Sequence, residues 1–186
     1  MAHRRFKWGG WLLSVLLPLC ALAAEPLTIR APYVAAAGGV YLLNTQLQFT
    51  VPEDLAPAIR DGATLNLTLD VKVSRNRNWW SDAVLAELEQ RYELVYHRVS
   101  ERYLVRNLNS GAQASFVDLP SALDSLRNIQ NLPVLDQELV MPDTRNEMSV
   151  RAALQLQSIP SVLSVLLFWK SDFGLQSDWY TWPLTP

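Results

Sequence analysis

The sequence predicts a mostly β protein, an antiparallel β-sandwich of immunoglobulin-like general architecture with two short helices in its crossovers. Residues 64–74 alternate apolar and polar side chains without a fault, which is the period-two pattern of a strand with one buried face. Residues 147–157 alternate nearly as cleanly, and turn-forming residues separate roughly seven to nine such stretches at short spacing. No linker divides the chain, so we expect one domain over residues 24–186.

The first third of this domain is expected to contain two strands and a helix before the long strand. A strand begins at 27–30, and small residues over 35–40 form a turn around a Gly-Gly pair. A second strand covers 41–51, and Thr45 is the one polar residue on its apolar face. Residues 52–62 begin with a proline, end with a glycine and place apolar side chains at helical spacing, which predicts a short helix.

The middle of the chain is expected to form strands joined by tight turns. Residues 81–90 contain good helix formers, so they are either a helix or the start of a long strand. The alternation returns over 91–97 and continues in a strand over 102–108. An Asn-Ser-Gly turn then leads to residues 112–117, which close a hairpin.

The last part of the chain begins with the clearest helix. Residues 118–130 place apolar side chains at helical spacing, with Asp118 as the expected cap and a proline in the first turn. Residues 131–142 are interpreted as an irregular connection because they contain two prolines. Residues 162–169 are interpreted as a buried strand, and 177–183 as a strand rich in aromatic side chains.

Residues 1–23 have the features of a secretory signal peptide. A basic start is followed by an apolar run and a small-residue motif, which predicts cleavage after Ala23 or Ala24. The alternative is an uncleaved membrane anchor, although the apolar run is shorter than the roughly 20 residues that a spanning helix needs. Cys20, the single cysteine, would leave with the signal. A thiol-free mature chain suits an oxidising compartment, and we expect a periplasmic protein.

Charge and residue types narrow the function classes. The signal carries three of the 16 basic residues and none of the 18 acidic ones, so the mature chain has 13 basic and 18 acidic residues and a net charge of −5. That balance does not favour nucleic acid as a partner. His97 is the one histidine of the mature chain. One histidine without cysteine gives too few ligands for a typical zinc site, and we expect no cofactor. A hydrolase would need His97 beside a serine and a carboxylate, which makes it the least favoured hypothesis.

An arginine and tryptophan cluster follows the long strand and is the first candidate for partner binding. It consists of Arg75, Arg77, Trp79 and Trp80. Tryptophan and arginine are frequent in binding hot spots. Cation–π stacking or simple burial of one tryptophan would explain the same residues by packing alone.

Trp179, Tyr180 and Trp182 form a second candidate, an aromatic patch near the end of the chain. We expect a non-enzymatic protein-binding accessory or sensory module. The alternative is a module that binds cell-wall glycan or lipid through exposed tryptophans.

Several short motifs spread over the mature chain resemble those of one exported bacterial family. They are Gly39-Val40-Tyr41 with Leu43, Leu55 with Ala58-Ile59 and Gly62, Arg75-x-Arg77 before Trp79-Trp80, Tyr96-His97 with Tyr103, Asn109-Ser110-Gly111 leading to Phe116, and Ser177-Asp178-Trp179-Tyr180. The chain is similar in these positions to domain of unknown function 4390. The resemblance implies a proteobacterial periplasmic protein, with a membrane sensor kinase as a candidate partner, and implies no activity.

Overall fold

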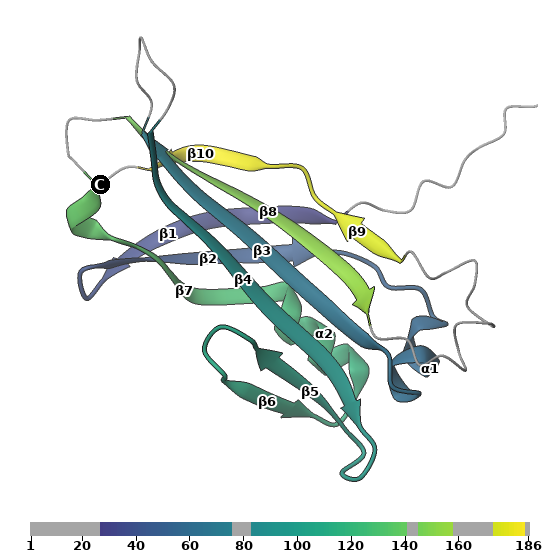
Figure 1. Cartoon of the computed structure of the whole chain (residues 1–186). Coiled ribbons are helices and arrows are strands. Elements are labelled where there is room, and N and C mark those ends of the chain that lie inside the picture. The colour runs from purple at the N-terminus through teal and green to yellow at the C-terminus, as the bar shows by residue number, and fades with distance from the viewer. Residues whose placement is uncertain (1–26, 76–82, 141–144, 158–172, 185–186) are drawn as a thin grey trace, which may run out of the picture.

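The computed structural model describes residues 27–75, 83–140, 145–157 and 173–184 (Figure 1). The expected signal peptide, over 1–23, and the expected strand over 162–169 lie outside the described residues. In the part of the chain that is described, no helix is long and apolar enough to span a membrane.

The described residues form two antiparallel sheets that share one apolar core (Figure 1). The smaller sheet has the strand order β1 (Thr28–Ala37), β2 (Val40–Gln48), β7 (Asn128–Asp136). The larger sheet has the order β10 (Tyr180–Leu184), β8 (Asn146–Gln157), β3 (Thr64–Arg75), β4 (Ala83–His97), β5 (Arg102–Asn107), β6 (Gln113–Phe116), and β9 (Gly174–Gln176) also pairs with β8.

The helices lie where the chain crosses from one sheet to the other. Helix α1 (Leu55–Arg60) connects β2 to β3, and α2 (Leu119–Arg127) connects β6 to β7. A short 3₁₀ helix, η1 (Gln137–Leu139), follows β7. The predicted fold class, antiparallel sheets with two short helices in the crossovers, is therefore confirmed.

Strand β3 is the centre of the larger sheet, as its alternation predicts. It pairs with β4 on one side and with β8 on the other. Its apolar side chains are at most 2 % exposed, and they are Leu65, Leu67, Leu69, Val71 and Val73. Burial of a leucine-sized side chain contributes about 1.5–3 kcal/mol, so this one strand supplies a large share of the core.

Helix α2 begins where the sequence predicts. Asp118 is extended, and its carboxylate accepts a hydrogen bond from the backbone N–H of Ser121 at 2.8 Å, which caps the first turn. The helix ends at Arg127, three residues before the predicted end, because the chain then pairs with β2.

The strand expected over 177–183 begins only at Tyr180, as β10. The expected bounds of two connecting segments also differ from the structure. The interpretation of residues 131–142 as an irregular connection is wrong for the first half of this range. There the chain forms part of β7, an edge strand that continues to Asp136. The expected turn at 35–40 is narrower than predicted, because β1 continues to Ala37 and only Gly38 and Gly39 turn, with φ of 60° and 81°.

The ambiguous stretch 81–90 is resolved as strand from Ala83 onward, as the beginning of β4. Val73 pairs with Ala86 while Ser74 pairs with Val84, so Leu85 is an extra residue on β4. This bulge shifts the alternation by one residue and hides the strand pattern in the sequence.

Candidate functional site

The first predicted cluster is only partly within the described residues. Arg77, Trp79 and Trp80 lie outside them. Arg75, the last residue of β3, is half-buried and donates a hydrogen bond from Nη2 to the carbonyl oxygen of Leu139 at 3.3 Å. Its Nε is buried and has no hydrogen-bond partner in the described structure. The described member of this cluster therefore packs against the end of η1.

The second predicted cluster, Trp179, Tyr180 and Trp182, divides between two faces of the larger sheet. Tyr180 and Trp182 pair with fully buried residues of β8, so both point to the inner face at the edge of the sandwich. Their ring centroids are 5.8 Å apart. The ring of Trp179 instead lies over Arg151, which belongs to the outer face. Successive side chains of a strand point to opposite faces, so three nearby aromatic residues need not form one patch.

Trp179 stacks on a cation that is itself held in place. The guanidinium carbon of Arg151 lies 4.7 Å from the centroid of the Trp179 ring. Arg151 donates from Nη2 and Nε to one carboxylate oxygen of Asp70, at 2.7 and 3.1 Å. Trp179 is 43 % exposed. We call Asp70, Arg151 and Trp179 the Trp179 platform.

Ser177 fixes the backbone that carries this tryptophan. It lies between β9 and β10, which both pair with the same side of β8. The backbone N–H of Ser177 donates to the carbonyl of Ala152 at 2.9 Å, and its Oγ accepts from the N–H of Ala152 at 2.9 Å. The Oγ also donates to the carbonyl of Asp178 at 2.8 Å. The buried Ser177 thus hydrogen-bonds to both the N–H and the carbonyl of Ala152, at the point where the chain between β9 and β10 leaves the backbone pairing with β8.

A crevice of about 280 Å³ borders the platform. Residues 27–29 at the start of β1 and residues 176–180 line it. Tyr180 is 45 % exposed there. Trp179 and Tyr180 both border this crevice, next to the edge strand β10.

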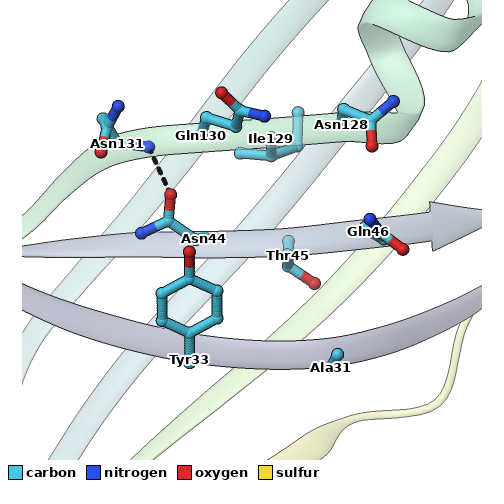
Figure 2. Close-up of a pocket in the computed structure, with 9 residues that line it drawn as sticks. All are labelled: Ala31, Tyr33, Asn44, Thr45, Gln46, Asn128, Ile129, Gln130 and Asn131. Carbon is cyan, nitrogen blue, oxygen red and sulfur yellow. Dashed lines mark hydrogen bonds between the residues drawn. The ribbon is translucent and has the colours of Figure 1, made fainter.

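A larger pocket, of about 420 Å³, lies on the smaller sheet, and sequence reasoning missed it (Figure 2). Tyr33 on β1 and carboxamide side chains on β2 and β7 surround it, and the carboxamides are Asn44, Gln46, Asn128, Gln130 and Asn131. The one signal in the sequence was Thr45, the polar residue on an otherwise apolar strand face. Thr45 is 4 % exposed, and its hydroxyl donates to the carbonyl of Arg30 at 3.3 Å.

His97 does not lie in either region. It is exposed at the end of β4, and its Nδ1 lies 2.8 Å from Oγ of Ser100, three residues later in the same turn. No carboxylate among the described residues hydrogen-bonds to His97. Across the described ranges, no group of three or more His, Cys, Asp or Glu side chains could hold a metal ion.

Two groups outside both regions have shifted pKa values. The hydroxyl of Tyr103 accepts a hydrogen bond from Nε of Arg60 at 2.9 Å, and this contact raises the pKa of Arg60. Burial raises the pKa of Tyr92 on β4, because it disfavours the charged phenolate. Neither shift gives an acid or base at neutral pH.

The comparisons with known proteins give one match. A family model described as "Domain of unknown function (DUF4390)" matches residues 24–183. No curated protein and no solved structure matches the chain.

Proposed function

Because the chain belongs to the family described as Domain of unknown function (DUF4390), whose description gives no activity, we propose a function from the geometry of its surface. The chain is an exported, non-enzymatic module that binds a partner protein through the Trp179 platform. The observation that carries this proposal is a tryptophan 43 % exposed, stacked on an arginine that a carboxylate holds.

The residue types at the platform are those that dominate protein interfaces. Trp and Arg are enriched among hot-spot residues, and the platform presents Trp179 and Arg151. Trp179 also exposes apolar ring surface that burial against a partner would remove from water.

The platform is preorganised, which lowers the cost of binding. Immobilising a flexible side chain at an interface costs about 0.5–1.5 kcal/mol. Arg151 is already fixed by two hydrogen bonds to Asp70, and the backbone before Trp179 is fixed by Ser177. Binding therefore orders little that is not ordered in the free protein.

The predicted compartment supports a membrane-associated partner. The signal-like residues 1–23 predict export, and the family resemblance implies a sensor kinase as the candidate. The periplasmic segment of such a protein would reach this surface. The cluster of Arg75, Arg77, Trp79 and Trp80 stays a prediction for a second contact.

Photocrosslinking in living cells tests the proposal. A photoreactive phenylalanine replaces Asp178, which is exposed beside Trp179, in the full chain. We expect irradiation to give a covalent adduct with a membrane protein, identified by mass spectrometry, and we expect Trp179→Ala in the same chain to remove it.

The matched control places the photoreactive residue at Val99, which is 91 % exposed in the turn between β4 and β5. An adduct that forms equally from position 99, or that survives Trp179→Ala, would contradict partner binding at the platform.

A further inference from the structure

We infer that the pocket on the smaller sheet is a second binding site and that its ligand is a neutral saccharide. This site goes beyond the proposed partner binding and uses none of the platform residues. It is formed by β1, β2 and β7, whereas the platform is formed by β3, β8 and the segment before β10.

Two bulges that face each other across β2 create the pocket. Arg30 pairs with Gln46 and Tyr33 with Asn44, so β1 has one extra residue at this point. On the other side, Leu43 pairs with Leu132 and Thr45 with Ile129, so β7 also has one extra residue. Each bulge contains a residue with positive φ. The two residues are Ala31, with φ of 43°, and Asn131, with φ of 53°.

The bulge on β7 changes which side chains face the solvent. In a regular strand Gln130 and Asn131 would point to opposite faces. Here both are exposed and both line the pocket, together with Asn128. Bulges often redirect side chains near functional sites, and strained backbone is retained where the surrounding structure enforces it.

A buried asparagine forms the fixed centre of the pocket. Asn44 is 8 % exposed, and its Oδ1 accepts a hydrogen bond from the backbone N–H of Asn131 at 3.0 Å (Figure 2). Its Nδ2 donates to the carbonyl of Leu42 at 3.3 Å. Figure 2 shows the hydroxyl of Tyr33 directed toward Asn44 from the neighbouring strand. The buried contact fixes the position of β7 and of the side chains around it.

Three other carboxamides are free to bind a ligand. The side chains of Gln46, Gln130 and Asn131 are exposed and make no hydrogen bond within the described part of the chain. A carboxamide offers two donors and an acceptor on one planar group. Adjacent hydroxyls of a sugar need both kinds of partner at short spacing. Tyr33, 59 % exposed, adds a ring face and a hydroxyl at the side of the pocket.

None of the residues that line the pocket has a charged side chain. This lining argues against a charged ligand such as a phosphate, a carboxylate or an amine. An anion would be expected to meet an arginine or lysine. A peptide strand is recognised by backbone pairing at a free sheet edge, and this pocket is centred on β2, the middle strand, whose neighbours already pair with it. A neutral, hydroxyl-rich ligand that contacts side chains is the remaining match. The volume of about 420 Å³ lies within the range of roughly 300–1,000 Å³ for small-ligand pockets.

Side-chain amide NMR of the ¹⁵N-labelled mature chain tests this inference directly. The probes are chitotriose, cellotriose and maltotriose, each titrated to millimolar concentration, with trialanine as a neutral peptide. We expect at least one sugar to give saturable shifts confined to the NH₂ signals of the pocket carboxamides. Tyr33→Ala should lower the affinity for that sugar at least tenfold, because it removes the aromatic ring face from an exposed site.

Asn131→Gly is the second variant, because glycine keeps the positive φ and removes only the carboxamide. We expect this variant to lower the affinity for the sugar several-fold. Gln155→Ala, which removes an exposed carboxamide from β8, is the matched control and should leave the affinity unchanged. An absence of saturable shifts with all three sugars, tighter binding of trialanine, or an affinity unaffected by Tyr33→Ala would each overturn the inference.

Discussion

The two central strands of the sandwich, β3 and β2, are built in opposite ways. Strand β3 pairs with β8 in an unbroken register from Thr64 to Arg75, and its one register shift against β4 falls near its end, between Val73 and Ser74. Strand β2 has one register shift against β1 and two against β7, and one shift on each side falls next to Asn44. The regular strand presents one continuous apolar face to the core. The irregular strand carries a buried polar residue and a pocket. In this protein, the regularly paired strand β3 stabilises the core. The interrupted pairing around β2 leaves polar side chains exposed that can bind a ligand.

Removing a core side chain from β3 should give the largest loss of stability. Leu67 is fully buried, so Leu67→Ala should lower the free energy of unfolding by about 2–5 kcal/mol, from lost burial and the cavity left behind. Val99→Ala, at a residue 91 % exposed, should change it by less than about 0.5 kcal/mol. Urea denaturation of the mature chain measures both. Equal effects of the two variants would contradict the central place of β3.

Removing the polar anchor of β2 should give an intermediate loss. Asn44→Ala leaves the N–H of Asn131 without its acceptor, which should cost about 1–3 kcal/mol. Gln46→Ala, at the next outward position of the same strand, should cost less than about 0.5 kcal/mol. The same denaturation experiment compares them. If Asn44→Ala is as mild as Gln46→Ala, the hydrogen bond across the bulge does not hold β7.

The smallest effect concerns the backbone of β1. Ala31 has a φ of 43°, a conformation that costs an L-residue roughly 1–2 kcal/mol. Ala31→Gly removes that strain and should leave stability unchanged or raise it by up to about 1 kcal/mol. Ala35→Gly, in the regular part of the same strand, should instead lower stability by about 0.5–1 kcal/mol. Thermal unfolding followed by circular dichroism measures the change in stability of both variants. If Ala31→Gly lowers stability as Ala35→Gly does, the bulge at Ala31 is not strained.

The regular parts of the fold were predictable from the sequence because their side-chain pattern is local. The alternation over 64–74 and the capped helix beginning after Asp118 each depend on residues close together in the chain. Strand β7 was missed because Asn131 interrupts its alternation at the bulge and Pro133 lies on it. Its pairing with β2 joins residues about ninety positions apart, which no local pattern indicates.

The candidate sites were less predictable, for the same reason. The pocket combines side chains from three strands, and only the register of β2 with both neighbours brings them together. Ser177 was noticed through the family resemblance, but its role depends on Ala152, twenty-five positions earlier. The aromatic residues near the end of the chain were identified, whereas their division between two faces follows from the pairing of β10 with β8.

The affinity of the mature chain for the soluble segment of its cross-linked partner tests the central claim most directly. Isothermal titration would compare the unmodified chain with Trp179→Ala, and with Val117→Ala as a control at another exposed apolar residue. A hot-spot tryptophan contributes about 2 kcal/mol or more, so we expect Trp179→Ala to bind about thirtyfold more weakly at an unchanged melting temperature. An affinity equal to that of the unmodified chain would contradict recognition by the Trp179 platform.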